Sequence, residues 1–231
     1  SGLARLSTGG WDGTMTLLKF NPLHMDVLKE IGNIGAGHAA SSLSQILGQP
    51  VHMQIPEVRI VSFDELAELA GGAEQVVVAT CLYFRGDVEG YMFFLLEERS
   101  AWKLAQFVYQ QPITAKGPAT EQDRELYLSA VQEIGNIVCS SYLSALADFT
   151  MLKISPSVPE LAIDMAGAII SYGLLEAGKV GDRALVIETC FVDSNHNEIP
   201  VDGHFLLLPH PDSYSIIFAA LGVSGHGKCS G

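Results

Sequence analysis

The sequence carries the five-residue word EIGNI twice, at Glu30–Ile34 and again 103 positions later at Glu133–Ile137. The same displacement brings Pro56 opposite Pro159, so a spaced pattern that reaches from the word to a proline is repeated. A match of that length at a fixed displacement indicates an internal duplication. Because only two copies occur with so long a period, solenoids and propellers are excluded, and we predict a pseudo-two-fold domain built from two repeats.

The repeats are bounded by segments of different composition. Residues 1–20 and 222–231 are rich in Gly, Ser or Thr and show no apolar periodicity, so we expect a flexible N-terminal extension and a flexible tail. Between them we predict a single domain over 21–221, made of repeats at about 21–117 and about 118–221.

The composition excludes several classes of protein. A hydrophobic content of 48% in 231 residues is enough for a substantial core. No apolar run approaches the roughly 20 residues that a membrane-spanning helix needs, and no signal-peptide pattern opens the chain. We therefore expect a soluble, cytoplasmic protein without membrane insertion. The formal charge of −13 would repel a phosphate backbone, which argues against nucleic acid as a partner.

Local signals predict the helices and strands of each repeat. Asn21-Pro22 offers an N-cap with proline in the first turn, and Thr120 with Asp123 resembles a capping box, so long helices should begin near 22 and 121. Strand-like runs follow, joined by turns at 85–87 and 193–197, which predicts an α+β fold with an antiparallel sheet and two long motif-bearing helices. The expected strands are 51–61, 76–84, 88–96, 152–155, 166–175, 183–192 and 203–208, with shorter helices near 63–70 and 98–109.

The repeated word falls on the exposed face expected of each long helix. At about 100° per residue, three polar side chains of each helix share a wedge of roughly 60° opposite an apolar arc. They are Asp26, Glu30 and Asn33 in the first copy and Ser129, Glu133 and Asn136 in the second. One such face is most simply a solvated surface, but packing does not explain why the Glu and Asn persist in both copies, so the pair indicates a binding partner. Gly32 and Gly135 are expected to allow close contact between the two helices.

Other motifs in the chain are weaker. Gly35–Ala40 matches the GxGxxA phosphate-binding pattern, but it lies inside a predicted helix and its counterpart lacks the glycines. Residues 193–204 begin like a calcium loop, yet Glu198 and His204 replace the required glycine and glutamate. No HxxxH, GxSxG or P-loop occurs, and the cysteines stand singly, so we predict no bound metal, no disulfide framework and no nucleophile of its own. The cysteines are Cys81, Cys139, Cys190 and Cys229.

Two spaced patterns carry a resemblance to a known family. They are Asp26-x3-Glu30-x2-Asn33-x22-Pro56 and Ser129-x3-Glu133-x2-Asn136-x22-Pro159. Both resemble the signature of the CheC/CheX/FliY family of chemotaxis phosphatases. Within that family the chain is most similar to CheC, because CheX-like members carry one working motif and FliY-like members add a flagellar switch domain. The likeness covers residues 20–221.

The resemblance implies a substrate and a role for each motif position. The substrate would be the phosphoaspartate of the response regulator CheY, with Mg²⁺ on that receiver and no cofactor bound by this chain. Asn33 and Asn136 would orient the attacking water, as a glutamine does in some GTPases. Glu30 and Glu133 would pair with the receiver's active-site lysine. The supporting positions would be Asp26, Ser129, Pro56 and Pro159.

The sequence leaves a second function open. CheC-like proteins also bind the receptor deamidase CheD, and a non-catalytic adaptor would act by regulating it. Intact amides in both copies favour catalysis, and the amphipathic segment 98–109 is read as core packing instead of a CheD-docking surface. A flagellar switch component would need an additional domain.

Two sites on one chain make a monomer sufficient and are compatible with a dimer. The replacement of Gly35-Ala36 by Val138-Cys139 predicts that the two sites are unequal.

Overall fold

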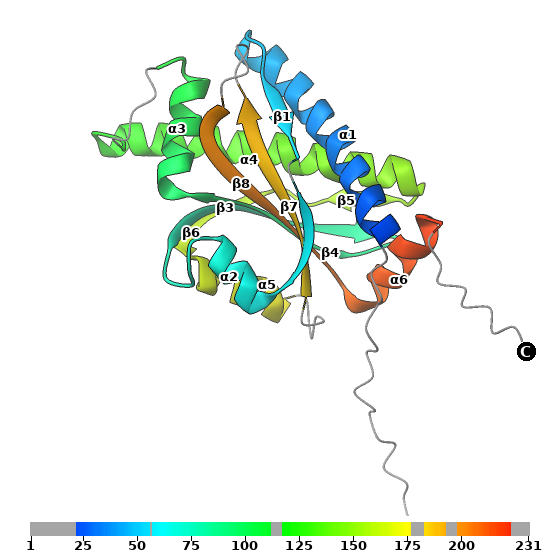
Figure 1. Ribbon diagram of the computed structural model, residues 1–231. Helices are drawn as coiled ribbons and strands as arrows, with labels where there is room; N and C mark the ends of the chain where they lie inside the picture. The colour runs from blue at the N-terminus through cyan, green and yellow to red at the C-terminus, as the bar shows by residue number, and fades with distance from the viewer. Residues whose placement is uncertain (1–21, 56, 112–116, 177–182, 193–197, 223–231) are drawn as a thin grey trace, which may run out of the picture.

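The fold is that of a computed structural model, which describes residues 22–55, 57–111, 117–176, 183–192 and 198–222 (Figure 1). The predicted N-terminal extension and all of the predicted tail beyond Gly222 lie outside these ranges. Within them, helices pack around an antiparallel sheet, which confirms the α+β fold class.

The order of elements in the first half of the chain recurs in the second. In the described ranges each half runs helix, two strands, helix, two strands, helix (Figure 1). The first half comprises α1 (Pro22–Leu47), β1 (His52–Gln54), β2 (Val58–Ser62), α2 (Phe63–Leu69), β3 (Val76–Gly86), β4 (Gly90–Glu97) and α3 (Glu98–Val108). The second comprises α4 (Glu121–Thr150), β5 (Ile154–Pro156), β6 (Glu160–Met165), α5 (Ala166–Glu176), β7 (Arg183–Val192), β8 (Glu198–Pro209) and α6 (Pro211–Ala220). The duplication inferred from the repeated EIGNI sequence is therefore also present in the order of helices and strands.

The sheet interleaves the two halves. Its strands run in the order β1-β7-β8-β4-β3-β5, while β2 also pairs with β7 and β6 also pairs with β3. Every one of these pairings is antiparallel. The first two strands of each half thus add to a strand of the other half, and β4 meets β8 at the centre. Neither half completes this sheet without the other.

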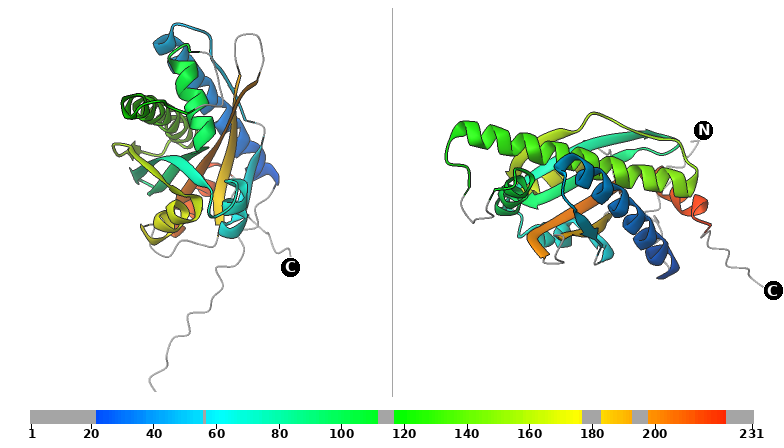
Figure 2. Two further views of the ribbon diagram at one scale, coloured as in Figure 1. Left: turned by 90° about the vertical axis from the view of Figure 1, so that its left-hand side faces the viewer. Right: turned by 90° about the horizontal axis from the view of Figure 1, so that it is seen from above.

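Each face of the sheet supports its own apolar core. Over one face lie α1, α3 and α4, and Figure 2 shows the two long helices crossing there. Over the other face lie α2 and α5. Phe93 and Phe94 of β4 are consecutive residues, so they point to opposite faces, and each belongs to a different core. The long helices are therefore held by a core that is separate from the one under α2 and α5.

The two long helices end in the same way, with a residue in the left-handed conformation. Thr120 and Asp123 form the predicted capping box of α4, with the Thr120 amide donating to Asp123 at 3.0 Å and the Asp123 amide donating to Thr120 at 3.1 Å. The predicted cap of α1, Asn21, lies outside the described residues. After the helices, Gly48 and Met151 take left-handed φ angles of 63° and 57° and stand 103 positions apart. Both helices therefore stop at the same point of the repeat.

The predicted strand at 166–175 is wrong, because this segment is helix α5. Its apolar residues suggested a strand, yet the buried ones are Ala166, Ile169 and Ile170, at the spacing of one helical face. The repeat itself held the correct signal. Ala166 stands 103 positions after Phe63, the first residue of the correctly predicted α2.

The other strand predictions hold with changes in length. The strand expected at 51–61 is divided into β1 and β2, and the break contains Pro56, a residue type that has no N–H to donate to a neighbouring strand. A turn joins β3 to β4 as expected, but it lies at 87–89 instead of 85–87, because Arg85 and Gly86 still belong to β3 and pair with β5. The turn expected at 193–197 lies outside the described residues. Two elements were not predicted, the strand β6 and the helix α6.

Two glycines set how closely the long helices approach their neighbours. A Cβ atom on Gly135 would overlap the side chain of Thr80 in β3, and one on Gly35 would lie 3.0 Å from the Cα of Tyr142 in α4. The close contact between the helices is therefore at Gly35, whereas Gly135 lets α4 approach the sheet. The expectation that Gly32 and Gly135 face the partner helix is wrong, because Gly32 lies against Ile55.

Replacement of Gly135 by alanine should destabilise the fold, because the added methyl group meets Thr80 in a packed core. We expect a loss of about 1–3 kcal/mol in the free energy of unfolding, measured by urea denaturation. Gly37→Ala is the matched control, since a Cβ there meets nothing within 4 Å and alanine favours a helix by up to about 1 kcal/mol. Equal stability of the two variants would contradict the close contact.

Candidate functional site

Both long helices turn their motif positions away from the apolar core. The exposed positions are Asp26, Glu30 and Asn33 on α1 and Ser129 and Glu133 on α4, while Asn136 is half-buried. In each copy the carboxylate and the amide stand three residues apart, so they share one helix face about one turn from each other. The outward orientation predicted from the helical wheel is confirmed, with Asn136 less exposed than the wheel suggested.

Buried neighbours hold each motif face in place. Ile31 and Ile134, which directly follow the motif glutamates, are 4% and 3% exposed and belong to the core between the long helices and the sheet. A side chain carried on such a packed helix is positioned more precisely than one on a loop. The motif faces are therefore rigid supports.

The second motif face borders an apolar groove of about 190 Å³. The groove lies where the C-terminal end of α1 and the end of α3 approach α4. Its lining includes Leu43, Ile46 and Leu47 of α1, Val108 of α3 with the adjoining Tyr109, and Ser129 and Glu133 of α4. Glu133 is thus a charged group at the edge of an apolar surface that two other helices complete.

Each long helix begins against the last helix of the other half, but the aromatic residues at the two contacts differ. In α1, His24 lies against Phe218 of α6, with 4.8 Å between ring centroids. The equivalent residue of α4, Tyr127, lies against both Trp102 and Tyr109, with centroids 6.1 and 6.3 Å away. The two copies therefore share a motif and the same neighbouring elements, but the side chains in contact there differ.

The amide of the second copy has a side-chain partner that the first copy cannot have. Ser140 Oγ donates to Asn136 Oδ1 at 3.3 Å, one turn along α4. The equivalent residue of α1 is Gly37, which has no side chain. Ser140 was not among the predicted site residues, although its spacing of four residues from Asn136 puts both side chains on one helix face.

The proline of the second pattern, Pro159, contacts α4. Pro159 is half-buried between β5 and β6, and its carbonyl oxygen accepts a hydrogen bond from Gln132 Nε2 at 3.3 Å. Gln132 directly precedes Glu133, so this contact ties the strand connection to the motif region of α4. Pro56 lies outside the described residues.

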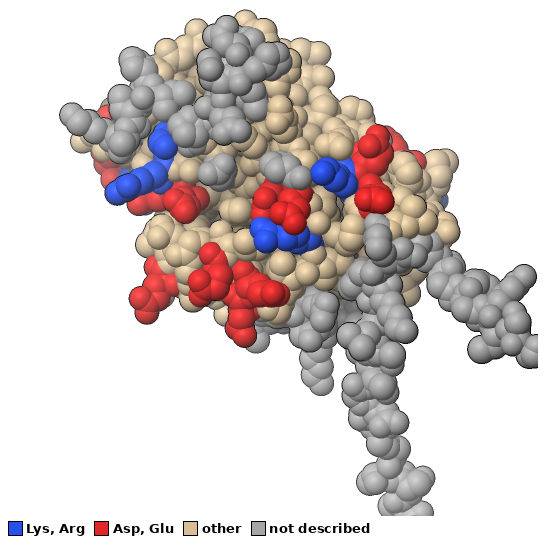
Figure 3. All heavy atoms as spheres, viewed as in Figure 1, with Lys and Arg blue, Asp and Glu red and all other residues tan. Residues whose placement is uncertain are grey.

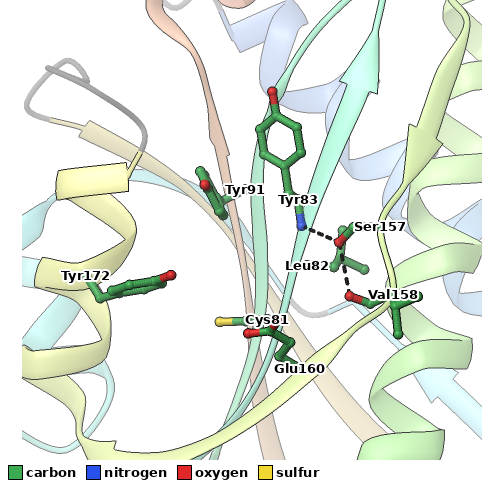
Figure 4. Close-up of a pocket in the computed structure, with 8 residues that line it drawn as sticks. All are labelled: Cys81, Leu82, Tyr83, Tyr91, Ser157, Val158, Glu160 and Tyr172. Carbon is green, nitrogen blue, oxygen red and sulfur yellow. Dashed lines mark hydrogen bonds between the residues drawn. The ribbon is translucent and has the colours of Figure 1, made fainter.

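A larger pocket, of about 390 Å³, lies away from both motif faces. Figure 4 shows Tyr172 of α5 pointing toward the strands that carry Tyr91 and Cys81. Burial, assisted by nearby Glu160, raises the pKa of the Cys81 thiol to about 12. The thiol therefore stays protonated near neutral pH and is a poor nucleophile. None of the predicted catalytic residues lines this pocket.

Charge and metal-ligand patterns give no second candidate site in the described residues. Figure 3 shows acidic side chains gathered at α2, whose exposed members include Asp64, Glu65 and Glu68. Throughout the described ranges, no three His, Cys, Asp or Glu side chains lie together as metal ligands would. That the chain binds no metal stays a prediction, and residues 193–197, where the rejected calcium-loop match begins, lie outside the described residues. Gly35–Ala40 lies within α1, so it forms no phosphate-binding turn.

None of the helices in the part of the chain that the structure describes is long and apolar enough to cross a membrane.

The arrangement of the motif suits chemistry at another protein's site. A carboxylate and an amide stand a turn apart on a projecting helix, where they can reach into a partner's cleft. The carboxylate offers a charged acceptor for a cationic group, and the amide offers both a donor and an acceptor for a water molecule. In the described residues the Ser140 hydroxyl is hydrogen-bonded to Asn136 and to no general base, so the pair is equipped to orient and bind.

The sequence matches the CheC-like family over residues 23–60 and 126–163, one stretch in each repeat. The CheY-P phosphatase CheC of Bacillus subtilis (strain 168) is 41% identical over 200 residues, which cover 87% of this chain and 94% of that protein. The putative CheY-P phosphatase CheC1 of Halobacterium salinarum is 26% identical over 165 residues, covering 70% of this chain and 82% of that one.

The fold also resembles a solved structure. The crystal structure of Thermotoga maritima FliY has a TM-score of 0.66 and 21% identity, and the match covers 89% of this chain and 98% of that one. At this identity the likeness concerns the fold alone.

Stability should decline in alkaline solution, partly because of Cys81. The folded chain keeps the thiol protonated up to a pKa of about 12, whereas the unfolded chain releases the proton near the ordinary value of 9.0. Between these values the unfolded state binds fewer protons, so the free energy of unfolding falls as pH rises. Urea midpoints measured from about pH 8.5 to about pH 10.5 should fall less steeply for Cys81→Ala than for wild type. Parallel declines would contradict the raised pKa.

Proposed function

The chain belongs to the CheC-like family, and we propose that it is a phosphatase of CheY-P, which hydrolyses the aspartyl phosphate of this chemotaxis response regulator. The observation that carries the proposal is the relationship to the Bacillus subtilis CheY-P phosphatase over nearly the whole of both chains. The exposed Glu and Asn in both repeats support the same function, because they supply a projecting polar pair on two rigid helices.

In the proposed mechanism the chain positions water instead of attacking phosphorus itself. An acyl phosphate is already activated, so a water held in line with the phosphorus is the missing reactant. Fixing it in an attack geometry is worth an effective concentration of roughly 10⁵ M or more in favourable cases. Asn33 and Asn136 would hold that water through their side-chain amides, and as neutral groups they would not repel the phosphoryl oxygens.

The glutamates would dock the helix on the receiver. Glu30 and Glu133 lie one turn from the amides on the same face, and a carboxylate there pairs with the receiver's active-site lysine. The Mg²⁺ that balances phosphoryl charge is expected on the receiver, with no cofactor on this chain. Asp26 and Ser129 complete the exposed faces, while Pro159 supports α4 through Gln132.

The location and assembly of the protein stay predictions from the sequence. A cytoplasmic location fits a substrate that belongs to a signalling pathway, and the two motif faces on one chain make a monomer sufficient for activity. A dimer would be compatible with both.

The first test of the mechanism is phosphate release from CheY-P in the presence of Mg²⁺. Asn33→Ala and Asn136→Ala should each lower the acceleration, and the double variant should lose about two orders of magnitude, because water is no longer oriented. The double variant should still bind CheY-P, since both glutamates remain. Gln45→Ala, which removes an exposed amide of α1 outside the motif, is the control and should keep full activity. A fully active double variant would rule out the mechanism.

A second candidate function, binding and regulation of CheD without catalysis, draws on a different surface. Val158 and Tyr172 are 83% and 55% exposed and line the pocket shown in Figure 4. Exposed apolar side chains grouped at a hollow are typical of protein-binding surfaces. This surface contains none of the motif residues, so an adaptor function would be separable from phosphatase activity. Helix α3, which the sequence predicted to pack in the core, buries Trp102 and Leu104 there.

Titration calorimetry with purified CheD tests the adaptor function. Tyr172→Glu should weaken binding about tenfold or more, because it places a charge in an apolar contact. The Asn33→Ala/Asn136→Ala double variant should bind CheD as wild type does. Unchanged affinity of Tyr172→Glu would exclude this surface, and absence of binding by wild type would exclude the adaptor function.

A further inference from the structure

Ser140 bonds differently from four other serines of the described helices, which donate to their own helix backbone. Ser41, Ser44, Ser141 and Ser171 each donate to the backbone carbonyl four residues earlier. Ser140 donates instead to a side chain four residues earlier, the amide oxygen of Asn136, at 3.3 Å. Its hydroxyl is therefore directed at the motif of the second copy.

The first copy lacks this contact but has room for it. Gly37 occupies the equivalent position of α1, is exposed, and a Cβ built on it meets nothing within 4 Å. Asn33 is exposed, whereas Asn136 is half-buried. The position four residues after the motif asparagine is therefore the one that differs. It holds Ser140, which reaches the amide, in the second copy and Gly37 in the first.

We propose that Ser140 is a positioning residue of the second site, which fixes the carboxamide of Asn136 for catalysis, and that Gly37 leaves the first site without this support. The inference rests on the proposed phosphatase function. Ser140 acts through Asn136 and does not itself contact the substrate.

The chemistry of the amide explains the benefit. The Oδ1 atom has two lone pairs, so it can accept from Ser140 and keep one for a water, while Nδ2 keeps both hydrogens. The hydrogen bond opposes rotation of the carboxamide, so less side-chain freedom is lost when the water is bound. Because ordering one such side chain has a modest cost, we expect an effect of about threefold to tenfold on kcat. KM for CheY-P should not change, since the docking glutamate is untouched.

The second site is tested alone in an Asn33→Ala background. There Ser140→Ala should lower kcat about threefold to tenfold with KM unchanged, and Ser140→Thr, which keeps the hydroxyl, should restore it. Ser141→Ala is the matched control, because that hydroxyl donates to the Ile137 carbonyl at 2.7 Å and not to the motif. A drop in kcat for Ser141→Ala equal to that for Ser140→Ala would overturn the proposal.

The reciprocal test installs the contact in the first site. In an Asn136→Ala background, Gly37→Ser should raise kcat about threefold or more, whereas Gly37→Ala, which favours the helix at least as much but has no hydroxyl, should not. An equal rise in both variants would attribute the gain to the helix and overturn the proposal.

A readout that does not need catalysis separates this inference from the proposed function. In ¹⁵N-labelled protein, NMR relaxation of the Asn136 side-chain NH₂ group should report greater mobility after Ser140→Ala and no change after Ser141→Ala. Greater mobility with unchanged kcat would overturn the positioning role and leave the phosphatase function intact. Equal activity of wild type and the Asn33→Ala/Asn136→Ala double variant would overturn the water-positioning mechanism and this inference with it. Failure of the wild type to accelerate phosphate release from CheY-P would overturn the phosphatase function itself.

Discussion

The packing of α1 and α4 against one face of the sheet determines which of their side chains are exposed to a partner. At Gly135 the absence of a side chain lets α4 press against Thr80, and at Gly35 it lets α1 press against Tyr142. These contacts fix the rotation of each helix about its axis. A shift of one residue would turn a helix by about 100° and bring its charged face toward the core, at the cost of burying an unpaired carboxylate. The geometry of the motif is therefore set by packing beneath it.

The two copies of the motif are alike in backbone and unlike in environment. Glu133 borders an apolar groove completed by α1 and α3, and Asn136 is bonded to Ser140. Asn33 is exposed, and the position that could support it is Gly37. The same two functional groups thus stand in a more enclosed setting in one copy and a more open one in the other. Such a difference changes how well a water is held without changing the groups that hold it.

The sequence predicted most of the frame but not all of the site. The repeat, the long helices and their exposed faces were readable because they depend on local spacing. Helix α5 was predicted as a strand because its run of apolar residues is typical of one. The displacement of 103 positions, which aligns this segment with α2, would have indicated a helix. Ser140 was missed because the comparison of repeats emphasised what the copies share. The groove beside Glu133 joins residues from three helices distant in sequence, and no local pattern reports such a meeting.

The exchange of strands between the halves has an evolutionary meaning. A protein with one repeat would leave β1 and β2 without β7, and it would regain this sheet only by exchanging strands between two copies of itself. In such a homodimer every mutation appears at both sites at once. Fusion of the two repeats into one polypeptide removes that restriction, so that one copy can acquire a serine where the other keeps a glycine. The interleaved sheet thus preserves the symmetry of the frame while each site is free to evolve separately.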